Sequence, residues 1–397
     1  MALDLTRLVS QVHGMAARLK ARSHERDERL VSTREALDRY GGDAQSLRKK
    51  IDASRTTWLV AGIVEGLGGC HRAPALPRDF TVVATDGSHI DVDRHRTARC
   101  YLLNIGSVVL RYGSHPAASL GSQPRLYADD EELVVSAPGT GGREQPIEGT
   151  LLGIKRTVEE CRALARLAAD LPGDTPTLAL MDGSLLLWGL EPYPEFVTEE
   201  LLDRGFIAGL EELSRLALQR EIVPASYISF PRSTDVVNAL RVALCPRETV
   251  DSDHCPACDS RECEALAGIR DRDLFGRVLG PGERSDVFMS SSKIQGRYGA
   301  HRVHFFYLEA DGEVARVEVP GWVALDRDRV GLAHSLVLDQ CRRGLGYPVA
   351  LSEAHEKAVV TGADAAGFWE LVERSLADQG LPVMGSAKSR SKRTRWV

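Results

Sequence analysis

Two copies of the tripeptide Asp-Gly-Ser, beginning at Asp86 and Asp182, are the residues most suited to chemistry in this sequence. Each copy follows an apolar run, residues 80–83 and 178–181, with the length and content of a buried strand. The Asp-Gly pair predicts a turn that leaves a carboxylate at the strand end. One copy alone is more often just a turn. Two copies together predict a site for Mg²⁺ or Mn²⁺, because these ions prefer oxygen ligands.

A third carboxylate is expected on the helix predicted for residues 149–171. Helical spacing places Glu160 on the apolar stripe of this helix and Glu159 on its polar face. An acid on an apolar stripe costs free energy unless it is paired or bound to a metal. Glu160 is therefore the candidate metal ligand, and a local ion pair with Arg156 is the alternative.

The fourth candidate is His355. Ser352 is a suitable N-cap residue, which places His355 in the first turn of a helix predicted for residues 352–360. There the positive end of the helix dipole would disfavour the imidazolium form. A neutral imidazole can bind a metal or orient water, although a lone histidine at such a position is more often structural.

Four of the eight cysteines fall within a short segment. Cys255 and Cys258 form a Cys-x₂-Cys pair, with Cys245 ten residues before it and Cys263 five residues after it. Four thiolates at this spacing predict a structural zinc site or an iron–sulfur cluster, with His254 as a substitute ligand. The alternative is a set of reduced cysteines without a metal. The catalytic ion should prefer Asp and Glu in either case.

The composition is that of an ordinary globular protein of 397 residues with a net charge of -6. This charge excludes the basic footprint of a passive DNA-binding module, so any contact with nucleic acid must be local. No apolar run reaches the roughly 20 residues of a membrane span, and the N-terminus lacks the features of a signal peptide. A cytoplasmic protein without a membrane partner is expected. The basic segment 388–397 is either a disordered terminus or an arm that contacts phosphates.

The order of predicted elements indicates an α/β (α+β) fold with a mixed sheet and flanking helices. Helices through residue 66 would form an N-terminal arm for dimer or partner contact, or pack on the main domain. Gly106-Ser107 would join two strands, 98–105 and 108–112, in a tight hairpin. The later elements are helices at 199–221, from 235, 326–343 and 352–360, and strands at 225–230, 302–308 and 315–319.

Three parts are predicted along the chain. Residues 1–70 form the helical arm, and residues 75–365 form the main domain with a cysteine-rich insertion at 245–265. A C-terminal helix and the basic tail occupy residues 366–397.

Candidate contacts to DNA phosphates are small hydroxyl and basic side chains in predicted loops. They are Ser88, Arg232, Lys293 and Arg297. Such residues are equally typical of a solvated loop.

In chain order, a set of motifs resembles that of a NurA-domain nuclease over residues 80–365. These are Thr85-Asp86-Gly87-Ser88, Glu160 on a helix, Leu180-Met181-Asp182-Gly183-Ser184-Leu185, Ile228-Ser229-Phe230-Pro231-Arg232-Ser233, Tyr347-Pro348 and Glu353-Ala354-His355. The resemblance implies an RNase H-like core and a homodimer that partners a HerA-type hexameric ATPase in DNA end resection and repair. It also implies Mn²⁺-dependent 5′-to-3′ exonuclease activity. Asp86, Glu160 and Asp182 would be metal ligands, and His355 would lie beside the metal or orient water.

The expected function is thus a divalent-metal-dependent deoxyribonuclease that acts on single- and double-strand ends, with endonuclease activity as well. No ATP-binding P-loop is present in the sequence, so ATP-driven movement on DNA would come from the partner. Two alternatives remain. One is an inactive binding module in a motor-ATPase complex, and the other is a metal-dependent phosphatase that uses the same carboxylates.

Overall fold

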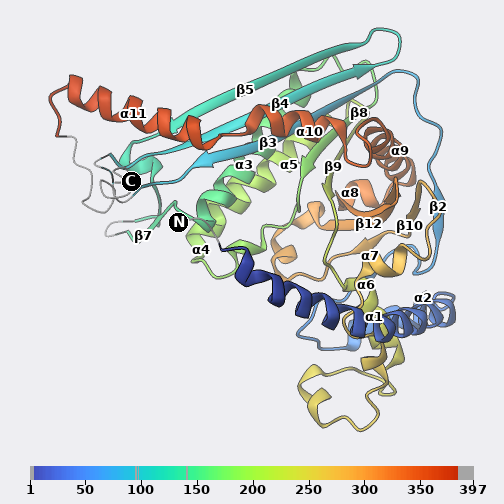
Figure 1. Ribbon diagram of the computed structural model, residues 1–397. Helices are drawn as coiled ribbons and strands as arrows, with labels where there is room; N and C mark the ends of the chain where they lie inside the picture. The colour runs from blue at the N-terminus through green and yellow to red at the C-terminus, as the bar shows by residue number, and fades with distance from the viewer. Residues whose placement is uncertain (1–3, 94–95, 97, 140–141, 383–397) are drawn as a thin grey trace. The chain divides into compact units, whose positions relative to one another are not determined.

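The computed structural model describes residues 4–93, 96, 98–139 and 142–382 (Figure 1). The chain divides into two compact units, each built from separate stretches of sequence. Unit 1 comprises Met1–Ala73, Ser229–Ser292 and His304–Val317, and unit 2 comprises Pro74–Ile228, Lys293–Val303 and Glu318–Val397. The basic tail lies outside the described residues. No helix in the described stretches is both long enough and apolar enough to cross a membrane.

Unit 2 contains a mixed sheet with the strand order β5-β4-β3-β8-β9. The strands are β3 (Phe80–Ile90), β4 (Tyr101–Tyr112), β5 (Ala117–Tyr127), β8 (Thr177–Asp182) and β9 (Ile222–Ile228). The first three pair antiparallel, whereas β8 and β9 extend the sheet in parallel from β3. When these five strands are counted along the chain, their order across the sheet is 3-2-1-4-5. This order confirms the expected RNase H-like core.

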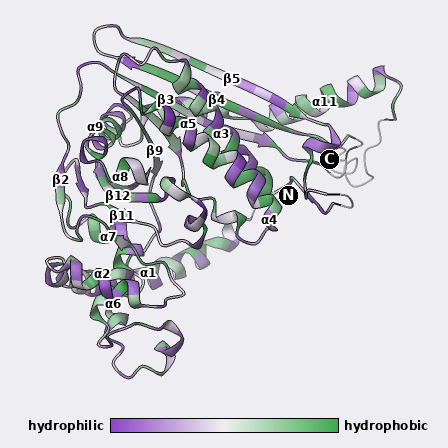
Figure 2. Cartoon of the chain, turned by 180° about the vertical axis from the view of Figure 1, so that it is seen from behind, coloured by the Kyte–Doolittle hydropathy of each residue, from purple (hydrophilic) through white to green (hydrophobic). Residues whose placement is uncertain are grey.

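Helices cover the sheet of unit 2. Helix α3 (Thr150–Asp170) contacts β3 and β8, and α10 (Val349–Ala358) contacts β3 and β4. The apolar residues of α3 join one buried core with α4 (Glu195–Thr198), a π-helical stretch (Glu199–Ile207) and α5 (Ala208–Leu216). Figure 2 shows α3 carrying both hydrophobic and hydrophilic residues, as expected of a helix with one buried face. The remaining helices of this unit are α8 (Gly321–Ala324), α9 (Arg327–Arg343) and α11 (Gly362–Asp378).

The hairpin predicted at Gly106-Ser107 is wrong. Strand β4 runs without interruption from Tyr101 to Tyr112, and both of its edges are paired. Gly106 is needed for another reason, because a Cβ atom there would lie 2.2 Å from the carbonyl oxygen of Ala354 on α10. The glycine permits close contact between a helix and a strand, not a turn. Strand β5 was not predicted, since most of its residues are exposed and its sequence lacks apolar alternation.

Unit 1 is built around α1 (Thr6–Tyr40), α2 (Ala44–Ala53), α6 (Asp235–Leu244) and α7 (Asp271–Phe275). Its short strands are β1 (Gly62–Ile63), β2 (Cys70–Arg72), β10 (Glu283–Ser285) and β11 (Phe288–Met289), beside most of β12 (Val303–Ala310) and β13 (Glu313–Pro320). The predicted N-terminal helices are present, and the second of them ends at Ala53 and not near residue 66. The second half of α1 is buried through Thr33, Ala36 and Leu37, and its first half exposes a row of apolar side chains.

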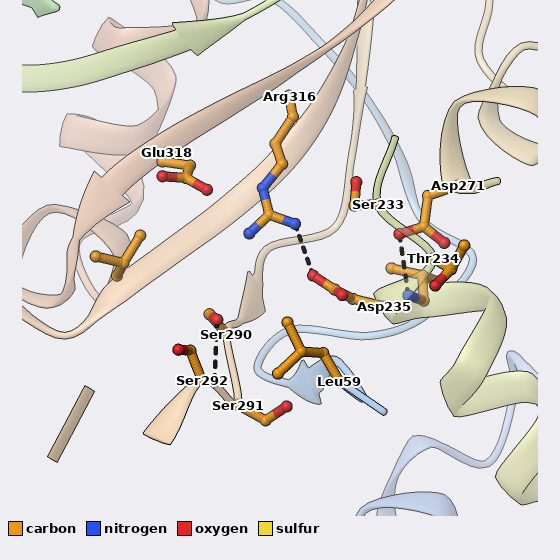
Figure 3. Close-up of polar contacts among 12 residues, drawn as sticks. Leu59, Ser233, Thr234, Asp235, Asp271, Ser290, Ser291, Ser292, Arg316 and Glu318 are labelled. Atoms are coloured by element: carbon orange, nitrogen blue, oxygen red, sulfur yellow. Dashed lines mark hydrogen bonds and ion pairs between the residues drawn. The ribbon is translucent and has the colours of Figure 1, made fainter. Parts of the chain in front are cut away.

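A buried polar network fixes the start of α6 in unit 1. The carboxylate of Asp271 accepts hydrogen bonds from the backbone N–H groups of Val236 (3.2 Å) and Val237 (2.8 Å). Figure 3 shows the guanidinium of Arg316 directed at Asp235, with 2.8 Å between the paired atoms. An acidic group at a helix N-terminus offsets the helix dipole. The helix that leads into the cysteine-rich segment therefore has a rigid beginning.

Candidate metal centre

Asp86 and Asp182 lie on neighbouring parallel strands of unit 2. The register pairs Thr85 of β3 with Met181 of β8, so the two aspartates that follow stand side by side. The predicted turn is confirmed for Asp182, where β8 ends and Gly183 adopts a φ of +80°. It is wrong for Asp86, because β3 continues unbroken to Ile90. The same tripeptide therefore has two different local structures.

Gly87 has a steric role and not a turning one. A Cβ atom at this position would lie 2.5 Å from Oε1 of Glu160 and 2.9 Å from Cγ of Arg156. The neighbouring Thr85 donates a hydrogen bond from Oγ1 to the carbonyl oxygen of Glu160 (3.0 Å). Strand β3 thus approaches the middle of α3 closely at Glu160, and a larger residue at position 87 would force Glu160 and Arg156 to shift.

The helical-stripe argument correctly separates Glu160 from Glu159. Glu160 is buried with 5% exposure, whereas Glu159 forms ion pairs with Lys155 and Arg162, each at 2.9 Å. Burial tends to raise the pKa of Glu159, but these two cations hold it below its usual value. Glu159 is thereby neutralised locally, and Glu160 is the acid directed toward the aspartates.

Glu160 also has the local partner proposed as the alternative. Its Oε1 lies 3.0 Å from Nε of Arg156, yet the two groups are not aligned for a hydrogen bond and neither atom has another hydrogen-bond partner. Burial raises the pKa of Glu160 to about 7, Arg156 opposes the rise, and the charges of Asp86 and Asp182 add to it. A buried carboxylate oxygen without a hydrogen bond is costly, and a bound cation would relieve that cost.

His355 contacts Asp86 directly. Its Nδ1 lies 2.7 Å from Oδ2 of Asp86, and the histidine side chain is 64% exposed. The predicted position within the helix is wrong: α10 begins at Val349 after Pro348, so Ser352 is inside the helix and His355 lies in its last turn. A residue in the last turn does not meet the positive end of the helix dipole, so the expected dipole effect does not apply. The contact with Asp86, not the dipole, orients the ring.

The C-terminal end of α10 is tied to the sheet by side chains of β3 and β4. Asn104 donates to the carbonyl oxygens of Lys357 (3.2 Å) and Ala358 (2.9 Å), and Ser88 donates to Ala358 as well. These bonds satisfy carbonyl groups that a helix end leaves without partners. Ser88, a candidate DNA contact, thus has a capping role that helps to position His355.

Tyr347 also belongs to this site, although the sequence did not predict a role for its side chain. It forms a side-chain hydrogen bond with Asp182, and its ring lies edge-on to Tyr227 with 5.6 Å between centroids. Tyr227 donates to the carbonyl oxygen of Gly346 (3.3 Å), which fixes the same turn. Packing around the carboxyl and the nearby charge of Asp86 raise the pKa of Asp182, against the effect of Tyr347. The Tyr347-Pro348 motif was the only sequence signal for this residue.

The three acids Asp86, Glu160 and Asp182, here called the carboxylate cluster, carry more negative charge than their neighbours balance. Arg156 is the cation paired with Glu160, and His355 contacts Asp86. Among the described residues, no three ligand atoms of this cluster and His355 lie within 4.8 Å of one another. Like charges at such sites repel. The oxygen-rich set and its buried Glu160 oxygen suit a hard divalent cation, which would draw the carboxylates together.

Sequence comparison identifies the family. The NurA domain profile matches residues 80–360, a range that contains the whole carboxylate cluster and His355. The chain belongs to the NurA-domain family.

The NurA fold also appears among solved structures. The chain is similar to the NurA nuclease from Sulfolobus solfataricus, with 12% identity, a TM-score of 0.49, and coverage of 96% of this chain and 98% of that one. No curated protein matches the sequence at a significant level.

The remaining candidate DNA contacts of this NurA-domain chain have different surroundings. In unit 2, Lys293 is exposed, whereas Arg297 is held in ion pairs with Glu195 (2.5 Å) and Asp203. In unit 1, Arg232 is exposed. Arg297 would have to leave two acids to reach a phosphate, so Lys293 is the better candidate of the two in unit 2.

A second acidic group lies in unit 1, and its first two members precede the range matched by the NurA domain. Glu65, His71 and Asp286 place their ligand atoms within 4.8 Å of one another and could hold a metal ion. Nε2 of His71 lies 2.7 Å from Asp286, and Arg284 lies 3.2 Å from Glu65. This Glu-His-Asp group was not predicted, since Asp286 is far in sequence from Glu65 and His71 and the three residues have no motif.

The four predicted thiolate ligands belong to unit 1. Cys245 follows the last residue of α6, Cys255 lies in a 3₁₀ turn at Ser252–Ala257, Cys258 follows that turn, and Cys263 lies in a second 3₁₀ turn at Glu262–Leu266. All four are free thiols and line one cavity.

Proposed function

We propose that the chain is a DNA nuclease that depends on Mn²⁺ or Mg²⁺ bound at the carboxylate cluster. The observation that carries this proposal is Oε1 of Glu160, a buried carboxylate oxygen without a hydrogen-bond partner beside two further acids. Arg156 is an ion-pair partner of this oxygen at 3.0 Å, but it makes no aligned hydrogen bond to it, so the oxygen can still accept a cation. In a nuclease family, a divalent cation is the ligand with matching chemistry.

The three carboxylates share one task in this proposal, and Tyr347 and His355 position two of them. Asp86, Glu160 and Asp182 would hold the cation, and the chemistry that it would supply is activation of water and stabilisation of the leaving oxygen of the phosphodiester. Tyr347 orients Asp182 through its hydrogen bond. His355 donates from Nδ1 to Asp86, because a carboxylate can only accept, and this leaves Nε2 free to orient water.

The proposed substrate is DNA, cleaved from single- and double-strand ends with 5′-to-3′ exonuclease polarity and with endonuclease activity. The exposure of His355 supports a polymeric substrate, since a site open to solvent can receive a strand. Lys293 would offer a phosphate contact on the same unit.

The proposed partners are a second copy of the chain and a HerA-type hexameric ATPase, which would supply movement on DNA during end resection. An apolar row on the first half of α1 supports such contacts. Its members are 48–67% exposed, which is unusual for a surface without a partner: Leu5, Val9, Val12, Met15 and Leu19.

The test is a cleavage assay with purified protein and DNA labelled separately at its 5′ and 3′ ends, with Mn²⁺, Mg²⁺ or EDTA. We expect metal-dependent release of short products, with loss of the 5′ label first, and slower nicking of circular single strands. Nucleoside monophosphates serve as the comparison substrate. Their hydrolysis without DNA cleavage would replace the nuclease with a phosphatase, and no cleavage of either would indicate a binding module.

A further inference from the structure

The cysteine-rich segment of unit 1 has almost no hydrophobic core. Between residues 246 and 265, Val250 is the one buried side chain. The hydrogen bonds of residues 253–262 are local, such as Cys258 N–H to the carbonyl oxygen of Cys255 (3.1 Å) and Asp253 N–H to Asp251 (3.1 Å). A segment that buries so little apolar surface cannot offset the entropy of ordering its backbone. Another interaction must hold it.

Four thiols converge on one cavity at this segment. The cavity has a volume of about 330 Å³ and is lined by the four-cysteine cluster: Cys245, Cys255, Cys258 and Cys263. The cluster is contributed by three stretches of chain that would otherwise be independent. No three of its sulfur atoms lie within 4.8 Å of one another in the described chain, so a shared ligand would have to draw them closer.

Side chains of α2 and α6 hold the backbone at Cys245 and Cys263, here called the scaffold cysteines. The ammonium group of Lys50 donates to the carbonyl oxygen of Cys245 (2.5 Å), directly after α6. Arg241, also on α6, donates to the carbonyl oxygen of Cys263 (3.3 Å) and lies 4.6 Å above the ring of Trp58. Because the buried network around Asp271 fixes the start of α6, these two ligand positions are set before any ion binds.

The other two cysteines form a metal-binding turn. The carbonyl oxygen of Cys255 accepts from the N–H of Cys258, and the Cys258 sulfur accepts from the backbone N–H groups of Ser260 and Arg261. Arg261, one of these two donors, adopts a left-handed φ of +45°. Donors aimed at a sulfur stabilise a thiolate, the form that binds metal. Arg241 and Arg247 beside the cluster would balance the surplus charge of four thiolates on one divalent ion.

We infer that the four-cysteine cluster binds one zinc ion, which fixes the 246–262 segment onto α6. Four thiolates in a closed set are a structural zinc arrangement, with no position left for substrate. The ion joins the two scaffold cysteines to the two turn cysteines and supplies the stabilisation that the missing core does not. The site is separate in composition from the carboxylate cluster, whose oxygen ligands select harder ions.

The first test measures metal content by mass spectrometry of the full-length protein, expressed with added zinc and purified without chelators. We expect about one zinc per chain, and near zero in Cys258→Ser. The matched control is Cys70→Ser, an exposed cysteine of the same unit outside the cluster. We expect Asp182→Asn to keep its zinc as well. That result would exclude zinc binding at the carboxylate cluster. Iron in place of zinc, a disulfide without metal, or full zinc content in Cys258→Ser would overturn the inference.

The second test uses the unmodified chain and so does not depend on a variant that folds. Titration with a mercurial that binds thiols should release the zinc as four thiols react, measured with a zinc indicator dye. Trypsin should then cut after Arg247 and Arg261, while the zinc-loaded protein resists at these two positions. Equal cutting before and after zinc release would show that the ion does not hold the segment.

Discussion

The two acidic groups of this protein differ in how their charge is balanced. In the Glu-His-Asp group, Oε2 of Glu65 accepts from Arg284 (3.2 Å) and from the N–H of Val287 (2.9 Å). Asp286 accepts from the N–H of Gly69 (2.7 Å) and contacts His71. In the carboxylate cluster, His355, Arg156 and Tyr347 are the partners of Asp86, Glu160 and Asp182 in turn, and one oxygen of Glu160 has no aligned hydrogen bond.

If the carboxylate cluster is the catalytic metal site, as proposed, close spacing alone does not identify such a site. The Glu-His-Asp group is tight because the protein supplies its counter-charges, and it would gain little from an added cation. The carboxylate cluster is wider because its charges repel and the protein leaves them only partly neutralised. Under the proposed function, the cation binds where the protein has not supplied hydrogen bonds for the carboxylates.

The largest expected effect is on the rate of DNA cleavage, which should depend on the carboxylate cluster and not on the Glu-His-Asp group. Asp182→Asn keeps the size of the side chain but removes one ligand charge, so we expect DNA cleavage to fall by about 100- to 1,000-fold. Asp286→Asn, the matched change in the Glu-His-Asp group, should leave cleavage within about twofold. The measurement is the initial rate on end-labelled DNA at saturating Mn²⁺. If Asp286→Asn abolished cleavage and Asp182→Asn did not, the two assignments would have to be exchanged.

The next effect is on stability without metal. Because the pKa of Glu160 is raised from 4.5 to about 7, the folded protein holds this proton more tightly than the unfolded chain. The stability that the neutral carboxyl contributes is complete below about pH 4.5 and is lost as the pH rises through 7. Glu160→Gln is neutral throughout. In EDTA at pH 8 it should be more stable than the wild type by about 3 kcal/mol, and equally stable at pH 4.

Urea unfolding at the two pH values measures this difference, and added Mn²⁺ supplies the control. The ion should stabilise the wild-type protein and have little effect on Glu160→Gln. Below pH 7 its binding should release a proton from Glu160, so affinity should rise with pH and then level off. An equal response of both proteins to Mn²⁺ would remove Glu160 from the ligand set.

A smaller change in stability is expected at the Glu-His-Asp group. Asp286 is buried, and Asp286→Asn weakens its bonds to His71 and to the backbone of Gly69. The expected cost is about 2 kcal/mol, typical of a hydrogen bond to a charged group. Thermal unfolding measures it, with Asp38→Asn on the exposed face of α1 as the control. A metal-dependent shift in the melting temperature that Asp286→Asn abolishes would instead make this group a working metal site.

The sequence predicted which acids belong to the carboxylate cluster more reliably than how the chain presents them. Periodicity was sufficient to distinguish Glu160 from Glu159, because burial of one helical face is a local property. It was not sufficient at Gly87 and Gly106, which look like turn residues but provide space for Glu160 and α10. Those contacts join residues far apart in the chain. The same limit hid the Glu-His-Asp group, whose members come together only in the folded unit.

The smallest expected effect compares His355, which contacts Asp86, with His71, which contacts Asp286 and lies 4.0 Å from Glu65. His355→Ala should reduce cleavage by about tenfold, because Asp86 loses the donor that orients it. His355→Gln can donate an amide N–H to the same oxygen and should recover most of that loss, whereas His71→Ala should not change the rate. The pH–rate profile is the deciding measurement. If His355→Gln were as slow as His355→Ala and lost a titration near neutral pH, His355 would transfer a proton and would not act only by holding Asp86.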